Sequence, residues 1–140
     1  MLYMLDTNML IYLMKHQSPQ IKDRIDALMP SDQLCMSFVT YAELCKGAEG
    51  SDRKAAVLNS LAALIAEIPV NYSVNASICR HYGELAARLK RFGTPIGAND
   101  LWIASHALAE SATLVSHNVQ EFARIDGLRL ENWVVSAQTS

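Results

Sequence analysis

Short apolar runs alternate along the chain with longer segments of helical periodicity. The runs at residues 2–5, 34–39 and 112–115 predict strands, and shorter ones at 67–70 and 128–130 predict two more. Apolar residues at three- and four-residue spacing predict helices at 9–14, 19–28, 40–46, 51–66, 75–91, 98–110 and 119–124. This alternation is typical of an α/β fold with a central parallel sheet and helices on both faces. We expect a single domain over residues 1–135 and a short flexible tail over 136–140.

Composition favours one globular domain of ordinary character. Of the 140 residues, 51% are hydrophobic and 19% charged, which excludes a disordered chain. No apolar run approaches the roughly 20 residues that span a bilayer, so we expect a cytoplasmic protein without a membrane segment. The three cysteines show no CxxC pairing, and we expect reduced thiols.

The charge balance gives only local support for nucleic-acid binding. A net charge of −2 is less positive than phosphate contacts alone would require. Positive residues nevertheless gather in the helix predicted at 75–91, where Arg80, Arg88, Lys90 and Arg91 are candidates for contacts to an RNA backbone. The alternative is that they form an ordinary solvated helix face.

Three acidic residues, far apart in the sequence, occupy equivalent positions. Asp6 follows the strand at 2–5, Glu43 follows the strand at 34–39, and Asp100 stands at the head of a helix. The carboxyl ends of parallel strands meet at one edge of a sheet, where ligands bind. Three carboxylates at that edge repel one another unless a hard cation lies between them, and oxygen ligands suit Mg²⁺ or Mn²⁺. The sequence therefore predicts a metal-dependent enzyme that acts on phosphate.

Each carboxylate also has a purely structural explanation. Asp6 could be a helix N-cap, Glu43 could complete a capping box with Thr40, and Asp100 could interact with a helix dipole. The three together are better explained by a shared site. Further polar residues lie at the same edge: Asn8 beside Asp6, and Ser116, His117 and Asn118 after the strand at 112–115. We expect Glu121, one helical turn further on, to be a surface residue.

Four segments resemble the PIN-domain ribonucleases, and among them the VapC-type toxins of bacterial toxin–antitoxin pairs. These segments span residues 4–8, 37–47, 95–104 and 114–122, in family order and across nearly the whole chain. The resemblance implies a catalytic acidic cluster of Asp6, Glu43 and Asp100 that binds Mg²⁺ or Mn²⁺. It assigns Asn8 and Ser116 to polar positions that support the cluster. Asn118 stands where many relatives carry a fourth acidic residue, which puts a tightly held second metal in doubt.

The same resemblance implies a reaction and several partners. The expected reaction is endonucleolytic hydrolysis of RNA, with a structured RNA such as a tRNA anticodon loop as the substrate. In-line attack on phosphorus by a metal-activated water predicts that the cut leaves a 5′-phosphate. The expected partners are a small antitoxin with a DNA-binding domain and a second copy of the chain. We expect the helices at 51–66 and 75–91 to wall the antitoxin groove.

Other functions remain as alternatives at this point. One is a catalytically weak RNA-binding or regulatory module with the same fold, and another is a PIN nuclease that cuts DNA. A phosphatase with an aspartate nucleophile is disfavoured because no second Asp follows Asp6 closely, and no Gly-rich P-loop is present.

Overall fold

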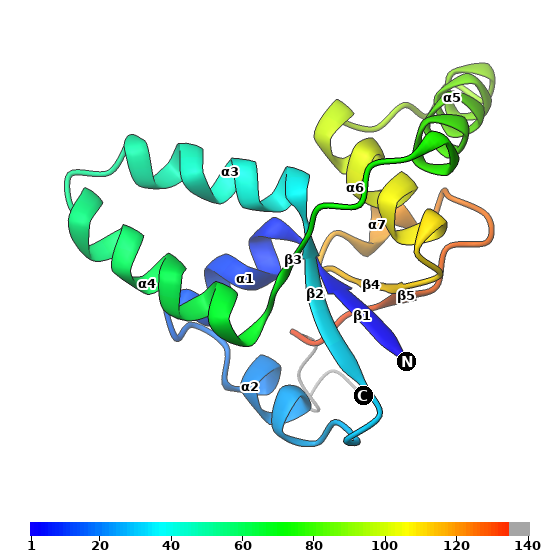
Figure 1. Ribbon diagram of the computed structural model, residues 1–140. Coiled ribbons are helices and arrows are strands. Elements are labelled where there is room, and N and C mark those ends of the chain that lie inside the picture. Colours follow the sequence, from blue (N-terminus) through cyan, green and yellow to red (C-terminus); the bar gives the residue numbers. More distant parts are fainter. Residues whose placement is uncertain (135–140) are drawn as a thin grey trace.

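The fold is a five-stranded, all-parallel sheet with helices on both faces (Figure 1). The computed structural model describes residues 1–134, so the tail predicted at 136–140 lies outside the described residues. The strands are β1 (Leu2–Leu5), β2 (Gln33–Ser37), β3 (Val70–Asn71), β4 (Thr113–Val115) and β5 (Leu130–Glu131), in the spatial order β3-β2-β1-β4-β5. The helices are α1 (Thr7–Met14), α2 (Pro19–Asp26), α3 (Phe38–Glu49), α4 (Lys54–Glu67), α5 (Ala76–Arg91), α6 (Ala98–Ala109) and α7 (Val119–Phe122). The predicted fold class is confirmed.

Both faces of the sheet are buried because alternate residues of the central strands enter two separate cores. Tyr3 and Leu5 of β1 pack in the core beneath α1 to α4, whereas Met4 packs in the core beneath α5 to α7. Met36 and Cys35 of β2 divide in the same way. Strands buried on both faces become continuous apolar runs, which explains the unbroken hydrophobicity of residues 2–5.

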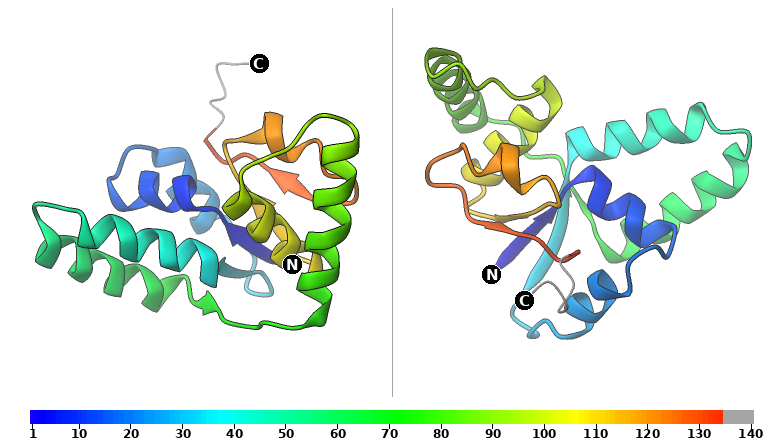
Figure 2. Two further views of the ribbon diagram at one scale, coloured as in Figure 1. Left: turned by 90° about the horizontal axis from the view of Figure 1, so that it is seen from above. Right: turned by 180° about the vertical axis from the view of Figure 1, so that it is seen from behind.

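The two groups of helices lie on opposite sides of the sheet in Figures 1 and 2. Helices α3 and α4 form an antiparallel pair that extends away from the sheet, with α1 beside it. Helices α5 and α6 pack closely against each other on the other side, where the rings of Tyr82 and Trp102 stack at 3.8 Å.

Local sequence signals fix several helix ends. The Asn75 side chain caps α5 by accepting a hydrogen bond from the Ile78 amide at 3.1 Å. Gly93 follows the end of α5 with a φ of +69°, a left-handed conformation that glycine adopts without strain. Pro19 occupies the first turn of α2, where its missing N–H costs no helical hydrogen bond.

The start of α3 was predicted wrongly. The strand β2 ends at Ser37, whose side chain caps the helix by accepting from the Val39 amide at 3.2 Å. Thr40 is therefore a buried residue within α3, not its cap, and α3 continues to Glu49 instead of ending at residue 46 as predicted. A Thr-x-x-Glu capping box at Thr40 and Glu43 is excluded, because Glu43 lies in the second turn.

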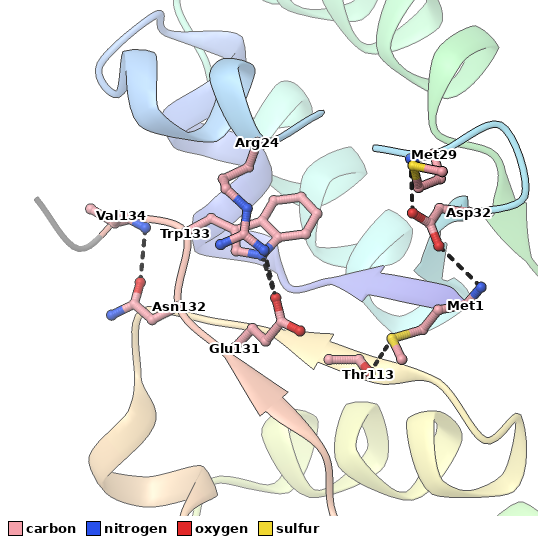
Figure 3. A network of polar contacts seen from close by, with 9 residues as sticks. All are labelled: Met1, Arg24, Met29, Asp32, Thr113, Glu131, Asn132, Trp133 and Val134. Atoms are coloured by element: carbon pink, nitrogen blue, oxygen red, sulfur yellow. Dashed lines mark hydrogen bonds and ion pairs between the residues drawn. The ribbon is translucent and has the colours of Figure 1, made fainter. Parts of the chain in front are cut away.

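The last described segment is fastened to α2 and to the sheet (Figure 3). The Arg24 guanidinium lies 5.1 Å from the Trp133 ring centroid and donates to Glu131 Oε1 at 2.9 Å. Trp133, 1% exposed, donates from Nε1 to the same oxygen at 3.0 Å and packs against Tyr3. Within residues 1–134, no helix is long and apolar enough to cross a membrane.

Candidate acidic active site

The three carboxylates singled out in the sequence gather at the carboxyl edge of the sheet. Asp6 ends β1 and caps α1, Glu43 lies in the second turn of α3, and Asp100 is the third residue of α6. Their proximity is visible in the electrostatics of Asp100. Its burial and the negative charges of Asp6, Glu121 and Glu43, in that order, raise the pKa of Asp100 from 3.8 to about 6.

Asp6 is the most deeply buried of the group, with 5% of its surface exposed. Its Oδ1 accepts a hydrogen bond from the Met9 amide at 3.0 Å, which is the N-cap interaction of α1. Burial raises the pKa of Asp6, while hydrogen bonds from the Ser116 hydroxyl and the Met9 amide oppose that rise. Capping and site assembly are thus compatible roles, since the same bonds fix the orientation of the carboxylate.

Glu43 is held by two polar neighbours from other segments. The Thr7 hydroxyl donates to its Oε1 at 2.5 Å, and the Asn99 amide donates to its Oε2 at 3.4 Å. Thr7 is the residue after Asp6, and Asn99 is the residue before Asp100. These bonds tie α3 to the two chain segments that carry the other carboxylates.

Glu121 is a member of the cluster that the sequence analysis left on the surface. It is half-buried in the first turn of α7, and its charge contributes more than that of Glu43 to the raised pKa of Asp100. The Asn118 amide donates to Glu121 Oε2 at 2.9 Å. Asn118, which stands where many relatives carry a fourth acidic residue, therefore holds an acidic residue in place, Glu121, three positions further along the chain. One sequence signal could have identified Glu121 as a site residue: like Asp100, it is the third residue of a helix.

The other polar residues at this edge have different surroundings. Ser116 is fully buried. Besides its bond to Asp6, its hydroxyl oxygen accepts a hydrogen bond from the backbone N–H of Asn118 at 2.9 Å. Asn8 is exposed in the first turn of α1 and makes no side-chain hydrogen bond within residues 1–134. His117 is exposed, pairs through Nδ1 with the Asn132 amide at 3.1 Å, and acts electrostatically to lower the pKa of Asp6.

The positive residues of α5 lie outside the cavities that border the acidic cluster. Arg88 is paired with Asp126 and lies over the Phe92 ring, so its charge is already engaged. Arg80, Lys90 and Arg91 are exposed and form no ion pair among the described residues.

A buried hydrogen bond joins the helices that carry Glu43 and Asp100. His106 of α6 is fully buried, and its Nδ1 lies 2.8 Å from the Oγ of Ser37, the cap of α3. Within residues 1–134, His106 Nε2 has no hydrogen-bond partner, although Glu110 Oε1 is 3.9 Å away. Burial lowers the pKa of His106, which favours the neutral ring at physiological pH.

Glu43 borders two cavities, one on each side of α3. The first, here the α5 cavity, has a volume of about 410 Å³ and lies between α3, α5 and α6. The second, here the α4 cavity, has a volume of about 420 Å³ and lies between α1, α3 and α4. Helix α4 lines one of these cavities and α5 lines the other, and a single antitoxin groove walled by both helices stays a prediction.

The acidic cluster fits a hard divalent cation in its chemistry. It offers only oxygen ligands, and the groups that shift the pKa of Asp100 are its burial and three further carboxylates, with no cationic side chain among them. Within the part of the chain that the structure describes, no three Asp, Glu, His or Cys side chains are arranged to hold a metal ion directly. The bonds from Thr7 and Asn99 hold Glu43 in place, so a shared ion requires rearrangement of the carboxylates or water between them.

Comparison with known proteins agrees with this arrangement of fold and site. The family model described as "PIN domain" matches residues 3–128, which is most of the chain. Ribonuclease VapC1 of Haemophilus influenzae strain R2866 is 50% identical over 133 residues, covering 95% of this chain and 98% of the relative. The tRNA(fMet)-specific endonuclease VapC of Salmonella typhimurium is 36% identical over 134 residues, covering 94% of this chain and 97% of the relative.

A solved structure is as similar to this chain in sequence as the Haemophilus influenzae relative is. In the 2.2 Å structure of VapBC-1 from nontypeable Haemophilus influenzae, one chain superposes with a TM-score of 0.90 at 50% identity, covering 96% of this chain and all of that chain. The present chain therefore belongs to the PIN-domain family and, within it, to the VapC ribonucleases. The predicted resemblance and the predicted class of enzyme are both confirmed.

Proposed function

We propose that this VapC ribonuclease is a divalent-cation-dependent endonuclease, with Asp6, Glu43, Asp100 and Glu121 as its catalytic cluster. The observation that carries the proposal is the gathering of three carboxylates, each from a different segment, around a fourth, the half-buried Asp100. Such a concentration of negative charge destabilises the free protein. It is therefore better explained by a bound cation than by a structural role for each residue.

A bound Mg²⁺ or Mn²⁺ would polarise the scissile phosphate and offset the charge that develops during the reaction. Asp6, Asp100 and Glu43 are the residues that would hold it, with Glu121 as a fourth donor. The Met9 amide and the Ser116 hydroxyl fix Asp6, while Thr7 fixes Glu43, so both carboxylates are oriented before the substrate arrives.

The reaction proposed at this site is in-line hydrolysis of a phosphodiester. A water oxygen forms the new bond to phosphorus, the bond to the 3′-oxygen breaks, and the products carry a 5′-phosphate and a 3′-hydroxyl. The proton from the water passes to a carboxylate of the cluster or to solvent, and the departing 3′-oxygen takes up a proton from solvent to become the hydroxyl. Because the 2′-hydroxyl is not the nucleophile, preference for RNA must come from groove shape and from contacts to the strand.

A structured RNA such as a tRNA anticodon loop is the substrate we propose. The support is the relative of known specificity, the tRNA(fMet)-specific endonuclease VapC, at 36% identity over nearly the full chain. We expect the enzyme to be cytoplasmic, which is where tRNA is found.

The neutralising partner we propose is a small antitoxin with its own DNA-binding domain. The support is the likeness to a chain of the VapBC-1 structure and the toxin–antitoxin role of the VapC family. The α4 cavity is suited to an antitoxin segment, because it lies between α1, α3 and α4 and borders Glu43, so an occupant reaches the acidic cluster. A homodimer of this chain stays a prediction.

An RNA cleavage assay on antitoxin-free protein tests the proposed function. We expect tRNA to be cut with Mg²⁺ or Mn²⁺ and to remain intact with EDTA or with the Asp6→Asn variant. Asp23→Asn, the same change at an exposed position of α2, is the matched control and should cut normally. A fully active Asp6→Asn protein would refute the assignment of the site.

The same assay separates the alternatives. Equal cleavage of matched RNA and DNA strands would favour a general PIN nuclease. Binding without cleavage, by folded protein supplied with either metal, would favour an RNA-binding or regulatory module.

A further inference from the structure

We propose that the α5 cavity binds one unstacked nucleobase of the RNA substrate, and that Lys46 contacts the phosphate of that nucleotide. The proposal rests on the proposed function, because it assigns a substrate subsite next to the acidic cluster. Apart from Glu43, the residues that line this cavity are not members of the proposed catalytic cluster.

The cavity has the composition of a base-binding pocket. Its walls are mostly apolar and include the aromatic rings of Phe38 and Trp102 together with Ile78. Trp102 is already stacked on Tyr82, with ring centroids 3.8 Å apart and planes 22° from parallel, so its orientation is fixed before any ligand binds. A volume of about 410 Å³ lies in the range of small-molecule sites and accommodates a single base.

The position of the cavity links it to the reaction site. Glu43 and Asn99 both line it, and the Asn99 amide donates to Glu43 Oε2 at 3.4 Å. Asn99 also immediately precedes Asp100 on α6. A group held in the α5 cavity therefore lies beside the carboxylates, at the place where a nucleotide next to the scissile phosphate would be.

Lys46 supplies the charge that such a nucleotide needs. It is exposed, lines the cavity, and stands three residues after Glu43 on the same side of α3. It takes part in none of the ion pairs formed within residues 1–134, so its ammonium is available to a ligand. The α5 cavity has no other basic residue in its lining, and none of the basic residues of α5 lines it.

An unstacked base fits these features better than the other occupants of an apolar cavity. Proteins that recognise RNA loops hold splayed bases against aromatic side chains and pair the backbone with basic residues. A second copy of the chain would also cover apolar residues, but it would leave unexplained why Lys46, Asn99 and Glu43 share the cavity.

A thermodynamic cycle between the cavity and the base tests the proposal. The Ala42→Phe variant fills the cavity from an exposed position of α3, and Ala62→Phe on α4 is the matched control outside the cavity. Both are made in the Asp6→Asn background, so that RNA stays intact while its affinity is measured. The probe is a tRNA anticodon stem–loop, either complete or with an abasic nucleotide at each loop position in turn.

We expect one abasic position to weaken binding about tenfold, in line with the value of one stacked base. Ala42→Phe should weaken binding of the complete RNA by a similar factor and remove the abasic penalty, while Ala62→Phe changes neither. An unchanged affinity in Ala42→Phe, or an unchanged abasic penalty, overturns the base pocket. Loss of a dimer in Ala42→Phe, with equal weakening of all the RNAs, would assign the cavity to a contact between copies and also overturn it.

Lys46→Gln and Lys22→Gln test the phosphate contact separately. Removing one phosphate contact to a single strand should reduce the slope of log K against log salt by about 0.7, and we expect this only for Lys46→Gln. An equal slope in both variants removes Lys46 from the subsite. Metal-dependent cleavage by the wild type, lost in Asp6→Asn, keeps the acidic site valid even if the cavity variants have no effect. Absence of both binding and cleavage overturns the two proposals together.

Discussion

Asp100→Asn is expected to make the metal-free protein more stable at neutral pH while abolishing cleavage. In the folded chain, burial and the charges of Asp6, Glu121 and Glu43 raise the pKa of Asp100 from 3.8 to about 6. The folded state therefore binds this proton more tightly than the unfolded state does. The contribution of Asp100 to the free energy of unfolding therefore falls as the pH rises from about 4 to about 6, and it stays lowered above that range.

The size of the effect follows from the shift. A change of about 2 pH units corresponds to roughly 3 kcal/mol at about 1.4 kcal/mol per unit. Asp100 is only half-buried, so solvent screening reduces this to about 1–2 kcal/mol. Loss of the favourable interaction with the N-terminus of α6 offsets about 0.5 kcal/mol. We therefore expect a net gain near 1 kcal/mol, or roughly 4 °C in Tm for a chain of this length.

Thermal unfolding in EDTA, from pH 4 to pH 8, measures this difference. The gap between Asp100→Asn and wild type should be present above pH 6 and absent near pH 4, whereas the exposed control Asp23→Asn should show no such dependence. Adding Mg²⁺ should stabilise the wild type and reduce the gap, because the cation binds the folded state and neutralises its carboxylates. A variant less stable than wild type at pH 8, or a gap of equal size at pH 4, would show that the reasoning is wrong.

The remaining predictions concern three neighbours of the site. In Glu121→Gln, the loss of stability due to Asp100 should occur at lower pH, because one charge that raises the pKa of Asp100 is removed. The same variant should bind Mn²⁺ more weakly in a calorimetric titration. If neither the pH dependence nor the Mn²⁺ affinity changes, Glu121 is not part of the cluster. Asn118→Asp should tighten Mn²⁺ binding and lower the Tm in EDTA, since it adds a carboxylate beside Glu121; a Tm equal to wild type in EDTA would argue against that proximity. Because the pKa of His106 is lowered in the folded state, the protein should lose stability as the pH falls below about 6.5. The His106→Asn variant, which keeps a polar group near Ser37 but cannot titrate, should not show this loss. Urea unfolding at pH 5 and pH 8 measures the difference, and an unchanged pH dependence would contradict the prediction.

Much of the site was predictable because rules of position select its residues. Polar residues that follow the strands of a parallel sheet meet at one edge of it, and this rule predicted the place of Asp6 at the end of β1. Asp100 follows no strand, and its place was predicted from its position in the first turn of a helix, α6. The same rule applied to Glu121, but the Asn118 side chain that holds it becomes visible only in three dimensions. Sequence distance alone made Glu121 resemble a surface residue on a short helix.

Other errors have equally specific causes. The apolar run at 34–39 continues from β2 into α3, so hydrophobicity could not show that the strand ends at Ser37. The basic residues of α5 suggested an RNA surface, but Arg88 is paired with Asp126, a partner 38 residues away. No sequence pattern identifies Lys46 as a binding residue, because only the packing of α3 against α5 and α6 places it in a cavity beside Glu43.

The four carboxylates come from positions spread between residues 6 and 121. Residues as far apart as Thr7 and Glu43, or Ser37 and His106, must meet before these side chains take their places. On a ribosome, a chain that lacks β4 and α7 also lacks Ser116, which orients Asp6, and Glu121 itself. A growing or prematurely ended chain would thus be harmless to the RNA around it, and toxicity would begin only with a nearly complete molecule. At that point an antitoxin can already recognise the finished fold.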